Sequence, residues 1–357
     1  MNSARLLRRV LPRISSASGR LYSTQTGKSA RNAVNIVEVG PRDGLQNEKG
    51  ATIPVDLKVD LINRLARAGV LNVEAGSFVS PKWVPQMAGT AEVLKRMEKL
   101  VGVHYPVLVP NQRGLEDLLK LLAEEASSPP LTDEVAIFTA ATDAFTKANL
   151  NCTIAESLTR LEPVAQTAVD HGLRVRGYVS VVIACPFSGK TDYKRVREVA
   201  KAMLDMGCYE VSLGETVGQG RPHEVADMIE EVKKSIPVEK LAGHFHDTYG
   251  TGVANVMTAL QHGIRTIDSS VGGLGGCPYS PGATGNVATE DVLYALQGSP
   301  YQVVGSTYGG GTIDLDKISD IGWWISEALG RDNASRVGRA LRARRQREEK
   351  EKMKSKL

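Results

Sequence analysis

One structural unit is visible in three consecutive stretches: Arg174-Val-Arg-Gly-Tyr-Val-Ser-Val-Val-Ile183, Lys194-Arg-Val-Arg-Glu-Val-Ala-Lys-Ala-Met-Leu-Asp-Met206 and Tyr209-Glu-Val-Ser-Leu-Gly214. The first and third stretches are short and rich in β-branched residues, which is typical of buried parallel strands. The middle stretch has apolar residues at helical spacing. Two neighbouring parallel strands need a crossover connection, and a helix of this length provides it. The three stretches therefore predict a strand–helix–strand unit.

The same alternation recurs along the middle of the chain, where eight strand-like runs alternate with amphipathic helical stretches. Eight such units are the content of a (β/α)8 barrel, which typically needs ~250 residues. We expect Pro163 to bend or divide the fourth helix. The expected strands are 34–40, 70–78, 104–110, 134–140, 174–183, 209–214, 241–246 and 265–271, and the expected helices are 56–68, 90–99, 114–125, 154–171, 194–206, 224–235, 253–262 and 291–297.

A doubly wound open sheet is the alternative arrangement. Its glycine fingerprint, G-x-G-x-x-G after the first strand, is absent, because that turn reads Gly40-Pro-Arg-Asp-Gly44. The sequence therefore favours an α/β fold of the (β/α)8 TIM-barrel class with extra C-terminal helices. We expect the catalytic barrel over 32–300, a helical extension packed on it over 301–330, and a charged tail over 331–357.

Charge is distributed unevenly along the 357 residues, whose net charge is +4. Residues 1–31 carry seven basic and no acidic side chains, and residues 331–357 carry eleven basic and four acidic ones, which leaves 32–330 with a net charge of −10. An acidic barrel argues against nucleic-acid binding. No apolar run approaches the ~18 residues of a membrane span. The four cysteines include no C-x-x-C pair, so neither a disulfide scaffold nor a thiolate zinc site is expected.

The two ends of the chain are typical of targeting signals. Residues 1–31 are rich in arginine and serine and lack acidic side chains, as in a mitochondrial presequence and linker. The final tripeptide, Ser355-Lys-Leu357, matches the peroxisomal address. We expect a mitochondrial matrix protein with a minor peroxisomal pool.

Metal ligands are predicted near the end of the seventh strand, because barrel enzymes carry their active sites at the carboxyl ends of the strands. His244 and His246 are two residues apart, so both side chains point to the same face of the strand, toward the barrel axis. A hydrogen-bonded polar core is the alternative, but metal ligation explains the pair better. The further donors, Asp43 and Asn286, offer oxygen, and a mixed imidazole and oxygen set suits Mg²⁺ or Mn²⁺ better than zinc.

Three more residues are candidates for catalysis. Arg42 follows the first strand, where a cation in the barrel mouth can stabilise a developing oxyanion. Glu74 interrupts the apolar run of the second strand, as an active-site carboxylate, as the ion-pair partner of Arg42, or in both roles. Cys277 lies in a loop with six glycines in fourteen residues, 272–285, which is either a flexible connection or a closing lid.

These motifs resemble the 3-hydroxy-3-methylglutaryl-CoA lyase family of metal-dependent barrels, with coverage from about residue 34 to 298. The similar segments are Glu38-Val-Gly-Pro-Arg-Asp-Gly-Leu-Gln-Asn-Glu-Lys49, Ser77-Phe-Val-Ser-Pro-Lys-Trp-Val-Pro-Gln86, Arg176-Gly-Tyr-Val-Ser180, His244-Phe-His-Asp-Thr-Tyr-Gly250, Gly273-Leu-Gly-Gly-Cys-Pro-Tyr279 and Gly282-Ala-Thr-Gly-Asn-Val-Ala-Thr-Glu-Asp291. The cysteine loop is the discriminating motif, because related synthases share the Arg-Asp and His-x-His motifs but lack it.

The resemblance implies cleavage of 3-hydroxy-3-methylglutaryl-CoA to acetyl-CoA and acetoacetate, in leucine breakdown and ketone-body formation, by a homodimer that binds neither nucleic acid nor membranes. By position, Asp43, His244, His246 and Asn286 match the family's metal ligands. Arg42, Cys277 and Glu74 match its catalytic residues, and Asp43 and His244 are both candidates for the general base. Two alternatives remain at this stage: a synthase that condenses an acyl-CoA with a 2-oxoacid, and a non-enzymatic protein that binds RNA or anionic membranes through the basic tail.

Overall fold

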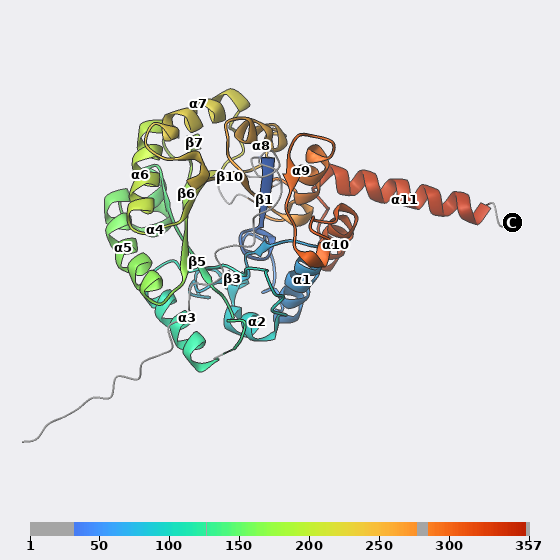
Figure 1. Ribbon diagram of the computed structural model, residues 1–357, viewed down its shortest axis with the longest axis horizontal. Coiled ribbons are helices and arrows are strands. Elements are labelled where there is room, and N and C mark those ends of the chain that lie inside the picture. Colours follow the sequence, from blue (N-terminus) through green and yellow to red (C-terminus); the bar gives the residue numbers. More distant parts are fainter. Residues whose placement is uncertain (1–31, 126, 277–284, 355–357) are drawn as a thin grey trace, which may run out of the picture.

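The computed structural model describes residues 32–125, 127–276 and 285–354. Its strands form a ring that is enclosed by helices, and all strand pairs in this ring are parallel (Figure 1). The ring strands are β1 (Ala33–Glu38), β2 (Asn72–Val73), β3 (Gly76–Ser77), β4 (Val107–Leu108), β5 (Glu134–Ala140), β6 (Arg174–Ser180), β9 (Glu210–Glu215), β10 (Leu241–Phe245) and β11 (Thr266–Ser269). The predicted α/β barrel is confirmed.

The second barrel strand is interrupted, although the sequence predicted one run over 70–78. Its first part, β2, pairs with β1, and its second part, β3, pairs with β4, so that together they close the ring. Between them the backbone N–H of Glu74 donates to the Glu38 carbonyl, and that of Ala75 to the Pro106 carbonyl. The chain thus changes partner at Glu74, whose side chain is completely buried inside the barrel.

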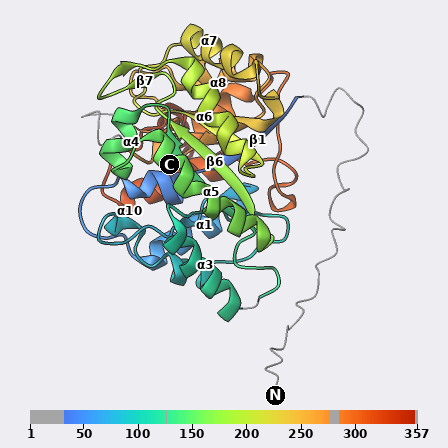
Figure 2. The same cartoon turned by 90° about the vertical axis from the view of Figure 1, so that its left-hand side faces the viewer.

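The helices that cover the ring are α1 (Val55–Arg67), α2 (Thr90–Arg96), α3 (Gln112–Glu124), α4 (Asp143–Leu150), α5 (Ile154–Asp170), α6 (Tyr193–Asp205), α7 (Pro222–Lys233), α8 (Gly252–Gln261) and α9 (Thr289–Leu296). In the side view α5 and α6 lie over β6 (Figure 2). A capping box of Thr153 and Glu156 begins α5. The apolar faces of these helices, apart from α4, and the outward side chains of the strands form one continuous hydrophobic core.

Of the two effects expected of Pro163, division of the helix does not occur, because α5 runs unbroken from Ile154 to Asp170. The residue lies on the exposed face of the helix. Water can therefore satisfy the backbone carbonyl that loses its partner to the proline ring. The flanking side chains Leu161 and Val164 are buried, and their packing holds the helix together across the proline.

Several short elements lie outside the predicted set. α4 follows β5, β7 (Ala184–Cys185) and β8 (Gly189–Lys190) form an antiparallel hairpin after β6, and β12 (Gln302–Val303) pairs with the start of β1. The segment 308–312 includes part of a 3-10 turn, Thr307–Gly309. A Cβ at Gly69 would lie 2.3 Å from the Thr312 carbonyl oxygen, so glycine at position 69 allows the backbone there to pack closely against that of Thr312.

Two C-terminal helices follow the barrel. α10 (Leu315–Ala328) packs against α1 and α9, and α11 (Arg336–Lys354) extends away from the barrel (Figure 1). Arg345 of α11 pairs with Asp316 and Asp320 of α10, and Arg342 lies over the Trp323 ring. Among the described residues, no helix combines the length and the apolar character that crossing a bilayer requires.

Candidate metal centre and active site

The first part of the site is a single π-helical turn, Gly40–Gly44, directly after β1. The buried carboxylate of Glu38 anchors it, since its Oε1 accepts hydrogen bonds of 2.9 Å from the backbone N–H groups of Gly40 and Val271. A Cβ at Gly40 would lie 2.6 Å from this oxygen, so only glycine fits. Such turns often occur at functional sites, and this one directs Arg42 and Asp43 toward the barrel axis.

The second part comes from β10. His244 lies opposite Asp268 of β11 in the parallel register, and its Nδ1 is 3.2 Å from Asp268 Oδ2. His246 follows the end of the strand, and its ring centroid is 5.5 Å from that of His244. Both side chains face the barrel interior, as their spacing predicted.

Asn286 reaches the same point by backbone pairing. It forms an antiparallel bridge with His246, in which the Val287 N–H donates to the Phe245 carbonyl at 3.0 Å. Its Nδ2 donates to Asp43 Oδ2 at 2.8 Å. A half-turn of this amide group would present Oδ1 at the same place, which gives the oxygen donor that a metal requires.

The donor atoms of Asp43, His244 and His246 all lie within 4.8 Å of one another. The Nδ1 atom of His246 is buried and has no hydrogen-bond partner among the described residues, which is costly unless another ligand occupies this position. Two imidazoles, a carboxylate and an amide at the carboxyl end of the barrel fit a divalent cation such as Mg²⁺ or Mn²⁺.

Burial and neighbouring charges both shift the pKa values of these groups. Burial and, to a smaller extent, the neighbouring His244 lower the pKa of His246 to about 4. Burial also lowers the pKa of His244, but the hydrogen bond to Asp268 and the negative charges of Asp268 and Asp43 together outweigh it and raise the pKa overall. Burial alone would raise the pKa of Asp43, whereas Arg42 and the two histidines bring it below its ordinary value. Asp43 is therefore ionised and His246 neutral, the forms in which both can bind a cation.

Arg42 lies beside this cluster and is almost fully buried. Its Nε donates to Glu74 Oε2 at 2.8 Å, and its Nη1 donates to Asp43 Oδ1 at 2.9 Å. The two acids hold the guanidinium group in one orientation, and they raise its pKa above the ordinary value despite burial. Of the roles expected for Glu74, the ion pair with Arg42 is what the structure contains.

A buried network below the site was not predicted from the sequence. Tyr178 donates from its hydroxyl to Glu74 Oε1 at 2.8 Å and accepts from Arg176 Nη1 at 2.6 Å. Arg176 Nη2 in turn donates to Asp268 Oδ1 at 2.8 Å. The network connects Glu74, the partner of Arg42, to Asp268, the partner of His244. Arg176 and Tyr178 are two residues apart on a strand, and this alternation was the available signal that both point inward.

These side chains open into a cavity of about 210 Å³ at the carboxyl end of the ring. Its polar wall contains Arg42, Asp43, His244 and His246, and its apolar wall contains Leu108, Phe138, Phe145 and part of Tyr178. The cavity therefore combines a few polar groups with an apolar wall, as sites for small molecules commonly do.

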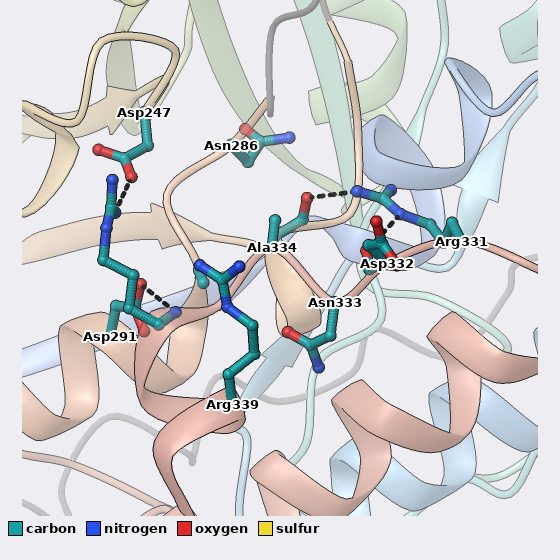
Figure 3. A pocket seen from close by; sticks show the side chains of 11 residues that line it. Asp247, Asn286, Asp291, Arg331, Asp332, Asn333, Ala334 and Arg339 are labelled. Atoms are coloured by element: carbon teal, nitrogen blue, oxygen red, sulfur yellow. Dashed lines mark hydrogen bonds and ion pairs between the residues drawn. The ribbon is translucent and has the colours of Figure 1, made fainter. Parts of the chain in front are cut away.

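A separate pocket of about 400 Å³ lies on the other side of Asn286 (Figure 3). The segment 331–339, which contains the end of the connection between α10 and α11 and the first turn of α11, forms one of its walls. Arg336 pairs with Asp247, the residue after His246, and the Asp291 carboxylate accepts from the backbone N–H groups of Arg336 and Val337. Arg331 pairs with Glu48 and donates to the Gly273 carbonyl. This segment thus connects three loops around the site.

The structure brings together six of the seven predicted site residues: Arg42, Asp43, Glu74, His244, His246 and Asn286. The seventh, Cys277, lies outside the described residues, as do the predicted targeting segments 1–31 and 355–357. The other cysteines, Cys152, Cys185 and Cys208, are buried free thiols.

A parallel (β/α)8 barrel with imidazole, carboxylate and amide donors at the carboxyl ends of its strands defines the class of metal-dependent barrel enzymes. Residues 33–322 match the HMGL-like family, and the chain belongs to this family. It is 51% identical to the hydroxymethylglutaryl-CoA lyase of Pseudomonas mevalonii, over 88% of this chain and 99% of that protein. It is 48% identical to the mitochondrial hydroxymethylglutaryl-CoA lyase of Bos taurus, over 94% of this chain and 98% of the relative.

The fold is shared with a solved structure as well. The crystal structure of hydroxymethylglutaryl-CoA lyase from Pseudomonas aeruginosa superposes with a TM-score of 0.81 at 48% identity, covering 88% of this chain and 98% of the other. The three relatives carry the name of a lyase, which favours the lyase over the synthase that the sequence left as an alternative.

Proposed function

We propose that this chain is a carbon–carbon lyase that cleaves 3-hydroxy-3-methylglutaryl-CoA to acetyl-CoA and acetoacetate by a metal-assisted retro-Claisen reaction. One observation carries the proposal: Arg42 lies beside the Asp43–His244–His246 donor cluster on the wall of a single cavity. The names of the relatives indicate the same substrate.

Asp43, His244, His246 and Asn286 would hold the divalent cation. When bound, a Mg²⁺ or Mn²⁺ ion acidifies a coordinated alcohol and neutralises a nearby carboxylate, which is what a tertiary 3-hydroxyl group with an adjacent carboxylate needs. The four residues come from three different loops or strand ends, so the barrel itself fixes their relative positions.

Arg42 is the electrophilic residue of this mechanism. Cleavage of the bond between C2 and C3 leaves negative charge on the thioester oxygen as the enolate forms. The guanidinium group faces the cavity and is fixed by Glu74 and Asp43, so it can stabilise this charge without reorganising. Glu74 is a positioning residue, because its carboxylate orients Arg42 and is itself oriented by Tyr178.

Two proton transfers complete the reaction. The 3-hydroxyl proton leaves as the ketone of acetoacetate forms, and Asp43 and His244 are the two groups that can receive it. The enolate carbon of the acetyl thioester then takes up a proton, which we assign to Cys277. This assignment rests on the sequence motif Gly276-Cys-Pro278 alone.

The test is an assay of both products, with and without exhaustive chelation. Purified protein should release acetyl-CoA and acetoacetate in equal amounts, lose this activity in excess EDTA, and regain it with Mg²⁺ or Mn²⁺. Full activity after chelation would contradict the metal assignment. No cleavage by metal-loaded protein would contradict the proposed reaction.

The location, the assembly and the domain limits are also proposals. The composition of residues 1–31 and the mitochondrial names of relatives support the mitochondrial matrix. The match of Ser355-Lys-Leu357 to a receptor-read tripeptide supports only a minor peroxisomal pool. Imaging of the full chain and of residues 23–357, both tagged internally, distinguishes the mitochondrial from the peroxisomal location. The family resemblance supports a homodimer, which sedimentation measures directly. We retain the domain limits 1–31, 32–300, 301–330 and 331–357.

A further inference from the structure

The residue after the second histidine, Asp247, joins two parts of the metal centre. Its backbone N–H donates to the Gly285 carbonyl at 2.8 Å, directly before Asn286. This bond lies next to the backbone bridge between His246 and Asn286. The carboxylate of Asp247 is buried, and its Oδ1 accepts from the Gly252 N–H at 2.7 Å. The position of Asp247 therefore helps to set how His246 and Asn286 lie relative to each other.

The second carboxylate oxygen of Asp247 is held by the C-terminal part of the chain. Arg336, in the first turn of α11, donates from Nη1 to Asp247 Oδ2 at 2.5 Å. The Arg336 side chain is 58% exposed, and an isolated ion pair of this exposure contributes little to stability. Whether Arg336 can orient the buried carboxylate depends on how firmly its own backbone is fixed.

Buried hydrogen bonds fix the backbone around Arg336. The Asp291 carboxylate accepts from Ser335 Oγ at 2.6 Å. It also accepts from the backbone N–H groups of Arg336 and Val337, at 3.2 and 2.9 Å. Ser335 and Asn333 are both buried, and Asn333 Oδ1 accepts from the Ser335 N–H at 2.8 Å. The first turn of α11 is therefore a rigid base for the cation of Arg336.

The same segment also contacts the other loops of the site. The Ala334 N–H donates to the Gly272 carbonyl at 3.0 Å, and Arg331 Nη2 donates to the Gly273 carbonyl at 3.2 Å. Arg331 also pairs with Glu48, in the loop after β1. The segment 331–337 thus contacts the loops after β1, β10 and β11, from which three of the four proposed metal ligands come (Figure 3).

We propose that Arg336 is a positioning residue of the metal centre, which acts through Asp247 on His246 and Asn286. This inference rests on the proposed function, because that function assigns the cation to these ligands. Groups outside the ligand shell commonly tune metal affinity by fixing the ligands. Here the fixing group is 89 residues further along the chain than its partner. The helical extension beyond the barrel therefore takes part in assembling the site.

The experiment measures binding of Mn²⁺ to metal-free protein by electron paramagnetic resonance of the free ion. Arg336→Gln should raise the Kd roughly three- to thirtyfold, less than the ~10–100-fold typical of a direct partner of a ligand, because Arg336 acts through one further residue. Arg336→Lys keeps the cation and should recover most of the affinity. Arg345→Gln is the matched control, because this arginine of α11 pairs with Asp316 and Asp320 of α10. Its Kd should equal that of the wild type.

The sign of the effect and a second readout distinguish positioning from a change in charge or in folding. Removal of a positive charge by itself strengthens the attraction of a protein for a cation. Weaker binding by Arg336→Gln therefore reports altered ligand positions. Saturating Mn²⁺ should restore kcat of this variant nearly to the wild-type value, because every group that lines the cavity is retained. Thermal unfolding of the metal-free protein should be alike for Arg336→Gln and Arg345→Gln.

Three results would overturn the proposal. The first is a wild-type Kd for Mn²⁺ in Arg336→Gln. The second is an equal rise of Kd in Arg336→Gln and Arg345→Gln, which would be a general effect of α11. The third is a lower unfolding temperature of metal-free Arg336→Gln with a kcat that saturating Mn²⁺ does not restore, which would make the ion pair structural only. If the wild type bound no Mn²⁺, the metal assignment of the proposed function would fail and this inference with it, and the wild-type titration alone identifies that failure.

Discussion

Two arginines lie inside the same barrel, and their surroundings differ in one respect. Arg42 is 6% exposed and Arg176 is 1% exposed, and each is held by two carboxylates. The guanidinium group of Arg42 lines the cavity at the carboxyl end of the ring. That of Arg176 is enclosed by Glu210, Asp268 and the Tyr178 hydroxyl. The Tyr178 ring lies between them. Its centroid is 5.3 Å from Cζ of Arg42 and 4.9 Å from Cζ of Arg176.

Burial and ion pairing therefore do not distinguish a catalytic arginine from a structural one in this protein. The distinction is access to the cavity, because only a group that lines it can act on charge that develops in the substrate. Arg176 instead compensates the buried Asp268, which orients His244. Substitution of Arg176 should therefore mainly lower the free energy of unfolding, and substitution of Arg42 should mainly lower turnover.

The largest expected effect is on stability. Arg176→Met removes the cation between Glu210 and Asp268 and leaves two buried carboxylates without it, which typically costs about 3–5 kcal/mol. Denaturant titration should show this loss in the free energy of unfolding, a large part of a total that is typically about 5–15 kcal/mol. Arg42→Gln should cost less, because its amide can still donate to Glu74 at the edge of the cavity. Equal losses of unfolding free energy for Arg176→Met and Arg42→Gln would contradict this distinction between the two arginines.

The second effect is on turnover. Arg42→Gln should lower kcat by ~10²–10³ and change the affinity for the thioester much less, because the missing cation acts mainly in the transition state. Steady-state kinetics on variants whose unfolding has been checked gives both parameters. If only KM rose, Arg42 would be a binding residue and would have no catalytic role.

The smallest effect extends the comparison to the acids. Asp268 lies beside Arg176, which lowers its pKa despite burial. Glu38 pairs with no cation in the described part of the chain, and burial raises its pKa to about 7 from the ordinary 4.5. The folded state therefore holds a proton on Glu38 that the unfolded state has released. This contribution to stability is complete below about pH 4.5 and is lost as the pH rises toward 7, by at most about 1.4 kcal/mol per pH unit.

The control for this effect is Glu38→Gln, which cannot titrate. The free energy of unfolding of the wild type, relative to that of this variant, should decrease between pH 5 and pH 7. Denaturant titrations at several pH values measure the difference. Parallel curves for the two proteins would show that Glu38 keeps an ordinary pKa in its buried position.

The sequence alone predicted the barrel and the side chains that gather at the carboxyl ends of its strands. Alternating runs predicted the strand order, and His244 and His246 pointed inward because their spacing is that of a strand. The interruption at Glu74 was not predictable, because it depends on the chain changing partner from β1 to β4 to close the ring. The role of Arg176 was missed for a related reason: its partner Asp268 is 92 residues away, and only the register of the sheet brings the two together.

The most direct test of the central claim is a titration of metal-free protein with Mn²⁺, followed by electron paramagnetic resonance of the free ion. His246→Gln is the informative variant, because His246 Nδ1 has no partner in the structure and its loss should leave thermal unfolding of the metal-free protein almost unchanged. The wild type should bind one Mn²⁺ per chain. The variant should bind it more weakly by more than the ~10–100-fold that loss of an outer-sphere partner typically costs. Binding by His246→Gln that equals that of the wild type would contradict the assignment of this cluster as the metal centre.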